Sequence, residues 1–163
     1  MDKKDMELLE ILGENARVSS KELATMLSLS ENETNERIKK LKQAGILKKF
    51  KAVIDWDKAG RNYVTAYIDV KMVPEAREGF KDVCELIAAH EKVEEVCLAS
   101  GAYDILLKVR CKDLNEVSHF VTEVLASKRT ITGTVTHFVL KRFKENGVIL
   151  DGGKKDKQLL MSP

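Results

Sequence analysis

Hydrophobic residues in the first third of the chain recur at the spacing of an α-helix. The stretch DMELLEILG places its apolar residues on one face, and Gly13 is expected to end this helix. The residues of this face are Met6, Leu8, Leu9, Ile11 and Leu12. The first element predicted is therefore a short amphipathic helix.

Two further helices are predicted by a repeated capping signal. Ser19 and Glu22, and again Ser30 and Glu33, have the S-x-x-E spacing in which hydroxyl and carboxylate each accept a hydrogen bond from the other residue's backbone N–H. A tight turn at Ser28-Leu29 separates the two helices. Three short helices, the last two joined by a tight turn, predict a helix-turn-helix arrangement.

From about residue 60 the hydrophobic period changes to two. The stretch YVTAYIDVKM alternates as a half-buried strand does, and Pro74 is expected to end it. Residues 75–90 and 114–127 return to helical spacing, whereas VEEVCLAS, ILLKVRC and ITGTVTHFVL have strand patterns. The order βαββαβ predicts an α+β chain in which a helix-turn-helix domain, with or without a wing, precedes a ferredoxin-like domain.

The same patterns assign the buried faces of the two later helices. Alternation on the third strand buries Ile105, Leu107, Val109 and Cys111. The helix positions expected in the core are Phe80, Val83, Cys84, Ile87 and Ala88, and then Leu114, Val117, Val121, Val124 and Leu125. Helices on one face leave the other face of the sheet open, so Thr65, Tyr67 and their neighbours are expected to form an oligomer surface.

The expected domain boundaries follow the change of period. Residues 1–60 form the helix-turn-helix domain with a linker strand from Phe50 to Trp56, and residues 61–146 form the ferredoxin-like domain. Residues 147–163 form a tail that is expected to be mostly mobile, although Val148, Ile149 and Leu150 could extend a sheet edge.

Composition excludes several classes of protein. The 163-residue chain has 44% hydrophobic residues and a net charge of +2, and no apolar run is long enough to cross a bilayer. Its first residues lack the order of a signal peptide, so we expect a cytoplasmic protein. Three cysteines without CxxC spacing favour reduced core thiols, with a metal or redox site as the alternative. No P-loop, nucleophile elbow or histidine ligand spacing occurs, so neither catalysis, a metal nor a cofactor is expected.

The helix in SENETNERIKKLKQAG shows one buried and one polar face at 100° per residue. Thr34, Ile38 and Leu41 form the buried seam. Glu31 and Glu33 lie in the first turn, where the helix dipole favours carboxylates. The outward residues are Asn32, Glu36, Lys39, Lys40 and Gln43, with Asn35 flanking them. Glu36 lies four residues before Lys40, a favourable pairing, and its outward carboxylate can accept from cytosine in a major groove.

Beyond Glu36 the charge becomes uniformly positive. The stretch RIKKLKQAGILKKFK holds seven basic residues and no acid, so a weakly charged protein concentrates its positive charge beside the third helix. This distribution predicts double-stranded DNA as a partner, with a solvated helix face as the alternative. The predicted DNA-contacting residues are Asn32, Asn35, Glu36, Arg37, Lys39, Lys40, Gln43, Lys48 and Lys49.

Taken together, the chain to about residue 146 resembles the Lrp/AsnC family of leucine-responsive and feast/famine regulators. The resembling residues are Asp2 and Asp5, LSLSENETNERIKKLKQAGIL, KKFKAVIDWDKAG and LASGAYDILLKVR. The resemblance implies a DNA-binding transcriptional regulator that forms homodimers, often assembled into octamers. It also implies that the ferredoxin-like domain binds an amino acid or a similar small effector.

The resemblance also implies an effector site at the turn Gly101-Ala102-Tyr103-Asp104 and on the last strand. The matching residues are Gly101, Tyr103, Asp104, Thr134 and Thr136. Ala102 stands where relatives carry an acid or amide, which removes one polar group, and Ser28 replaces the usual glycine between the second and third helices. The alternatives are that Asp104 only caps the turn and that both threonines are ordinary strand residues.

Two other functions compete with this interpretation. Siroheme decarboxylases resemble the same two-domain architecture, but their central segment is rich in histidine and arginine, whereas the matching stretch here is SGAYDILLKVR. An oligomerisation module that does not bind DNA is the second alternative, and the basic segment argues against it.

Overall fold

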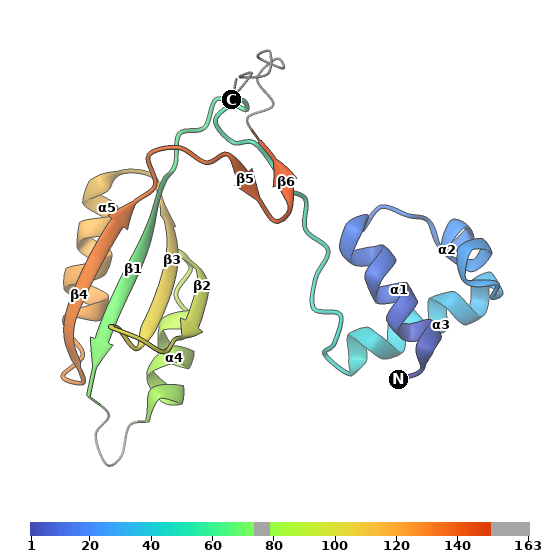
Figure 1. Cartoon of the computed structure of the whole chain (residues 1–163), viewed down its shortest axis with the longest axis horizontal. Helices are drawn as coiled ribbons and strands as arrows, with labels where there is room; N and C mark the ends of the chain where they lie inside the picture. Colours follow the sequence, from blue (N-terminus) through green and yellow to red (C-terminus); the bar gives the residue numbers. More distant parts are fainter. Residues whose placement is uncertain (74–78, 151–163) are drawn as a thin grey trace, which may run out of the picture. The chain divides into compact units, whose positions relative to one another are not determined.

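Two compact units make up the chain, one from Met1 to Ala52 and one that begins at Val53 (Figure 1). The computed structural model describes residues 1–73 and 79–150. The expected strand end at Pro74, the first residues of the predicted 75–90 helix and the tail beyond Leu150 lie outside the described residues.

The first unit is a bundle of three helices, α1 (Lys3–Glu14), α2 (Ser20–Leu27) and α3 (Glu31–Gln43). Asp2 and Asp5 form a capping box at the start of α1, and the helix continues one residue past Gly13 before it ends. The buried side chains that hold the three helices together are Leu8, Leu12, Leu23, Leu27 and Leu41. The predicted helix-turn-helix arrangement is confirmed.

The turn between α2 and α3 is built on a left-handed residue. Ser28 has φ 54° and ψ 48°, and the N–H of Leu29 closes the turn on the carbonyl of Ala24 at 2.9 Å. The capping box of Ser19 and Glu22 is complete. At α3 only half of the predicted box forms, because Ser30 accepts from the Glu33 N–H while the Glu33 carboxylate binds Arg37 instead.

The second unit contains a four-stranded antiparallel sheet in the order β2-β3-β1-β4. Its strands are β1 (Val64–Met72), β2 (Val93–Leu98), β3 (Ile105–Cys111) and β4 (Ile131–Phe138). Its helices are α4 (Phe80–Ala88) and α5 (Leu114–His119), which a π-helical turn, η1 (Phe120–Leu125), extends. This is the predicted ferredoxin-like topology.

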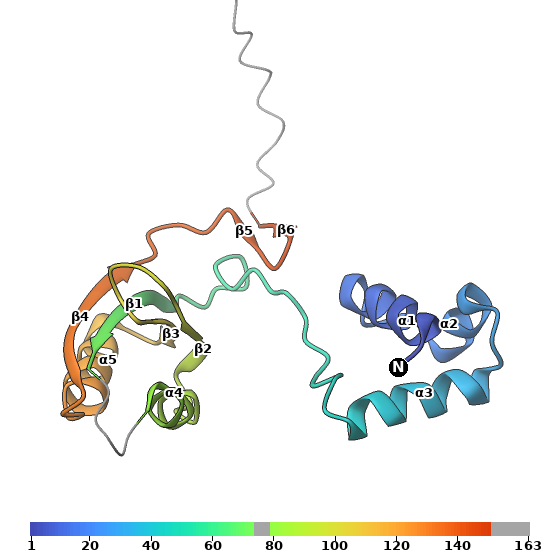
Figure 2. The ribbon, with the colours of Figure 1, turned by 60° about the horizontal axis from the view of Figure 1, so that its bottom comes forward.

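Both helices cover the same face of the sheet (Figures 1 and 2). Alternate residues of β1 and β3 point toward them, and Ile68, Ile105 and Leu107 are fully buried. The helix side of this core consists of Val83 and Ile87 of α4 and Val117 of α5. The last core residue of β3 is Cys111, as the sequence pattern predicts. Burial of this continuous apolar surface is the main stabilising term of the unit.

The predicted buried face of the 114–127 helix is partly wrong. Leu114 keeps 58% of its surface exposed, whereas Phe120, which the helical pattern omits, keeps 2%. The change to π geometry at Phe120 adds a residue to the turn and rotates the face that follows. Val121 and Val124 consequently only border the core. In α4, Ala88 is likewise exposed.

The linker strand predicted from Phe50 to Trp56 does not form. Among the described residues the first strand of the chain begins at Val64. Phe50, Val53 and Ile54 are exposed, and the Phe50 ring instead lies 4.8 Å from the Lys42 ammonium. A strand needs a neighbouring backbone to pair with, and a favourable side-chain pattern does not provide one.

The start of the predicted tail is ordered as a small hairpin. β5 (Lys144–Glu145) pairs with β6 (Val148–Ile149), and the Leu150 N–H donates to the Phe143 carbonyl at 2.9 Å. The suggestion that residues 148–150 extend a sheet edge is therefore wrong, because they pair with the segment just before them.

Candidate functional sites

The outward face of α3 is polar and open to solvent. All of the predicted DNA-contacting residues are exposed except Arg37, and the buried seam consists of Thr34 and Leu41 with Ile38 partly buried beside them. Glu36 lies 4.0 Å from Lys39 rather than pairing with Lys40. The Asn35 side-chain oxygen accepts a hydrogen bond from the Ser20 hydroxyl at 2.6 Å, which connects α3 to the start of α2.

Arg37 has a different role from its neighbours. Its Nη1 donates to Asp2 and to Asp5, each at 2.8 Å, and its Nε and Nη2 donate to Glu33 at 3.1 and 2.9 Å. The side chain is 21% exposed. Three carboxylates therefore hold this guanidinium, and the contact ties the capping box of α1 to the third helix.

This ion cluster shifts the pKa values of its members. Hydrogen bonds from Arg37 lower the pKa of Asp2, and the backbone N–H of Asp2 together with Arg37 lowers the pKa of Asp5. Groups with a lowered folded-state pKa stabilise the protein above their unfolded values, and this stabilisation is lost as the pH falls through the folded values. The cluster therefore holds α1 and α3 together at neutral pH.

Asp104 is anchored at the end of β1. One carboxylate oxygen lies 3.1 Å from the Lys71 ammonium, and the other accepts from the Met72 N–H at 2.9 Å. The hydrogen bond from the Met72 N–H, and to a smaller extent that from Lys71, lowers the pKa of Asp104. The Asp104 N–H also donates to the Val70 carbonyl at 3.0 Å. The carboxylate therefore has a structural role in the turn.

The other predicted effector residues lie on both sides of β1. Gly101 has φ +138°, a backbone conformation that side chains other than glycine rarely adopt, and Tyr103 is half-buried. Thr134 pairs with Val70 and Thr136 with Ile68 from the β4 side. Since adjacent strands are about 4.8 Å apart, the threonine edge and the Asp104 edge are separated by roughly 10 Å across β1.

The open face of the sheet carries a network of ion pairs that the sequence patterns do not reveal. Glu145 of the hairpin contacts Lys108 at 2.7 Å, Arg142 at 2.6 Å and Arg110 at 3.6 Å. Glu94 of β2 contacts Lys108 and Arg110, each at 3.0 Å. The network attaches the hairpin to the sheet. The Asn146-Gly147 dipeptide was the available signal, because it favours the turn that brings Glu145 back.

The predicted oligomer surface needs a correction on this face. Thr65 is only 7% exposed, and it lines a cavity to which residues 139–142 and Glu145 of the same chain also contribute walls. Tyr67 remains exposed, and beside it His137 lies 2.9 Å from Asp69. The open face is thus partly covered by residues 139–145 of the same chain.

Cys84, Cys111 and His90 occupy ordinary structural positions. Burial raises the pKa of Cys84 and Cys111, which disfavours a reactive thiolate. The His90 ring packs edge-on against Phe120 with centroids 5.0 Å apart. Across residues 1–73 and 79–150, no three histidine, cysteine or acidic side chains are grouped to hold a metal ion. Within the same ranges no helix is long and apolar enough to cross a membrane.

Known proteins share both units of this chain. Residues 1–48 match the family model described as winged helix-turn-helix DNA-binding, and residues 65–149 match the Lrp/AsnC ligand binding domain. The chain is 37% identical to the uncharacterized HTH-type transcriptional regulator YugG of Bacillus subtilis, over 100% of this chain and 99% of the relative. It is 32% identical to the HTH-type transcriptional regulator FL11 of Pyrococcus furiosus, over 89% and 93%.

A solved structure has the same fold. The transcriptional regulator NMB0573 of Neisseria meningitidis, in complex with L-Met, superposes with a TM-score of 0.69 at 28% identity, over 93% of this chain and 97% of that one. The two family models and the relatives, which are named as transcriptional regulators rather than enzymes, identify this chain as a transcriptional regulator. This chain belongs to the Lrp/AsnC family.

Proposed function

We propose that the protein binds specific double-stranded DNA sequences through α3 and that an amino acid modulates this binding. The observation that carries the proposal is the exposed face of α3. It combines amides and a carboxylate that can read base edges with lysines that can contact phosphates. Lys48 and Lys49, exposed just after the helix, extend the positive surface. Arg37 acts in this proposal as a positioning residue, because carboxylates already surround it.

We further propose that the regulator acts as a homodimer, which can assemble into octamers. One helix-turn-helix unit offers few contacts, and paired units read half-sites about one DNA turn apart, or a multiple of it. Exposed apolar side chains on and after β4 support self-association: Val135 is 57% exposed, Phe143 63% and Leu140 97%.

Replacing Lys39 and Lys40 together with alanine should weaken DNA binding at every sequence. If each lysine contacts one phosphate, the negative slope of log K against log salt should become shallower by about two, since each lost contact removes about 0.9 from its magnitude. Fluorescence anisotropy with DNA selected by the wild-type protein, measured from low to high salt, gives this slope. The DNA should carry two half-sites, and a fragment with one half-site should bind more weakly.

The matched control is the pair Lys3 and Lys81, exposed lysines on α1 and α4, changed to alanine. This double variant should keep the wild-type slope. Single changes at Asn32 or Glu36 should instead alter which sequences are preferred. An unchanged slope in the Lys39 and Lys40 variant would remove both lysines from the interface.

For the effector, the solved relative with L-Met supports an amino acid as the class of ligand. We propose that its ammonium replaces that of Lys71 on Asp104, near Gly101 and Tyr103, while Thr134 and Thr136 contribute from the other side of β1. Because the two edges are well separated in one chain, a second subunit is proposed to complete the site.

Calorimetry with a panel of amino acids should therefore separate two variants. Asp104→Ala should weaken binding of the active amino acid by about tenfold or more, the size expected for a lost charge-assisted hydrogen bond. Lys71→Ala should leave binding unchanged or strengthen it, because the competing ammonium is gone. Equal binding by the wild type and both variants, with fold and assembly intact, would show that Asp104 only supports the turn.

A further inference from the structure

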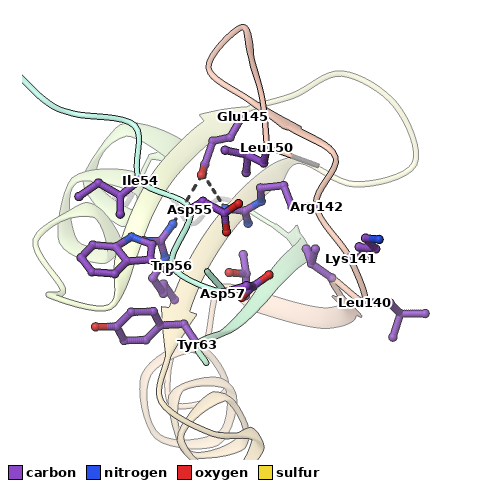
Figure 3. Close-up of a pocket in the computed structure, with 13 residues that line it drawn as sticks. Ile54, Asp55, Trp56, Asp57, Tyr63, Leu140, Lys141, Arg142, Glu145 and Leu150 are labelled. Atoms are coloured by element: carbon purple, nitrogen blue, oxygen red, sulfur yellow. Dashed lines mark hydrogen bonds and ion pairs between the residues drawn. The ribbon is translucent and has the colours of Figure 1, made fainter. Parts of the chain in front are cut away.

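A small cavity in the second unit lies apart from the residues proposed for the effector (Figure 3). Its volume is about 100 Å³. The turn at residues 54–57, the start of β1, Arg110 of β3 and residues 139–142 form its walls, and Glu145 and Leu150 of the hairpin segment close one side. The volume is well below the roughly 300–1,000 Å³ of a pocket for a drug-sized ligand, so only a small group fits.

The guanidinium of Arg142 is the unusual group in this wall. Its Nη1 donates to Glu145 at 2.6 Å. Its Nη2 is buried and has no hydrogen-bond acceptor within the described part of the chain. Leaving a buried charged donor unpaired is costly, and arginine presents its donors in a planar fork that matches a carboxylate. The Nη2 group therefore favours a bound acceptor.

The rest of the wall selects among acceptors. Trp56 and Tyr63 stand edge-on with centroids 5.7 Å apart, and the Arg110 guanidinium lies 5.7 Å from the Tyr63 ring. Glu145, Asp55 and Asp57 place negative charge in the same wall, where Glu145 is paired with Lys108 and Asp55 with Lys58. These acids disfavour a dianion such as phosphate more than a monoanion, because repulsion grows with the charge of the ligand.

We propose that this cavity binds the carboxylate of a small organic acid, held by Nη2 of Arg142 against the Trp56 and Tyr63 rings. This site is distinct from the one proposed around Asp104. The ligand would connect the turn at residues 54–57 to the segment after β4. Occupancy of the cavity would therefore hold the linker against the ferredoxin-like unit.

Trp56 allows a direct test, because it is the only tryptophan of the chain. The full-length protein is titrated with sodium acetate and with sodium propionate at constant ionic strength, and Trp56 fluorescence is followed. Wild type should show a saturable change, and sodium phosphate and sodium chloride should not. No saturable change with either carboxylate, or a stronger response to phosphate, would overturn the proposal.

Two variants assign the response to Arg142. Arg142→Lys keeps a cation for Glu145 but lacks the planar fork, and the apparent affinity for acetate should fall about tenfold or more. Arg129→Lys, at an exposed arginine outside the cavity, should titrate like wild type. Equal titration of Arg142→Lys and wild type would also overturn the proposal.

Asp104→Ala should leave the acetate response unchanged, which separates this site from the proposed effector site. If Arg142→Lys does not fold, heteronuclear NMR of the wild type provides the second measurement. The Trp56 indole and Arg142 side-chain signals should then shift together as acetate is added. Independent or absent shifts would contradict the site.

Discussion

Replacing Phe120 with alanine should destabilise the second unit by about 3–5 kcal/mol, the usual cost of removing a buried phenylalanine from a core. Phe120 is 2% exposed and lies in the cluster formed by β1, β3, α4 and α5. The substitution removes the ring that packs against His90 and leaves a cavity in the core cluster that also contains the fully buried Leu125. The close packing of this core prevents the gap from closing completely.

The free energy of unfolding of this unit can be followed by Trp56 fluorescence in urea. Leu114→Ala is the matched control, since Leu114 lies on the same helical segment but is 58% exposed, and its cost should be well below 1 kcal/mol. Equal losses for the two variants would mean that the π-helical turn does not set the buried face. A larger loss of stability in Leu114→Ala would indicate that this segment keeps the regular helical register, with Leu114 buried.

The second large effect is expected at Glu145. Its carboxylate is 13% exposed and accepts from Lys108 and Arg142. Glu145→Gln leaves the largely buried Arg142 without an anion, whereas Lys108 keeps Glu94. Removing one partner of a buried pair costs about 3–5 kcal/mol, and the residual exposure here reduces the expected loss to about 2 kcal/mol. The hairpin of β5 and β6 should then detach from the sheet before the unit unfolds.

The pH dependence of this loss follows from the pKa of Glu145. Burial raises this pKa, but the hydrogen bonds from Lys108 and Arg142 outweigh burial and lower it overall. The stabilisation is therefore present above the unfolded-state pKa and is lost as the pH falls through the lowered folded-state value. Urea unfolding of wild type and Glu145→Gln should differ at pH 7 and converge in acid.

Glu123→Gln, at an exposed glutamate of η1, is the control and should match wild type at both pH values. Hydrogen exchange gives a local measure, because the amides of β5 and β6 should lose protection in Glu145→Gln alone. Unchanged exchange in the hairpin would show that other contacts hold it in place.

Local patterns were sufficient for much of the fold. The periods of 3.6 and 2 predicted the three helices of the first unit and the βαββαβ order of the second, because one face of each element must be buried. Alternation on β3 correctly placed Ile105, Leu107 and Val109 in the core. The seam of Thr34 and Leu41 and the exposed face of α3 also followed from the sequence. All of these features depend on residues within a few positions of one another.

Contacts between distant residues were beyond these patterns. The linker pattern at residues 50–56 favours a strand, but no backbone in the described chain pairs with it. Glu33 was expected to complete a cap, yet Arg37 binds it together with Asp2 and Asp5 from α1. The Asp104 carboxylate binds the Lys71 ammonium and the Met72 N–H, two contacts that no local pattern predicts, and its role as an effector ligand stays a prediction.

One physical cause separates the features that the sequence predicts from those that only the tertiary structure decides. Amphipathic period and helix capping are properties of neighbouring residues, so helices, strands and their exposed faces can be derived from the amino-acid sequence. The ion-pair partners of a charged group depend on side chains that only folding brings within a few ångströms. The same is true of the π-helical turn that buries Phe120. The cavity beside Arg142 belongs to this second kind, because its walls come from residues as far apart in the chain as Ile54 and Leu150.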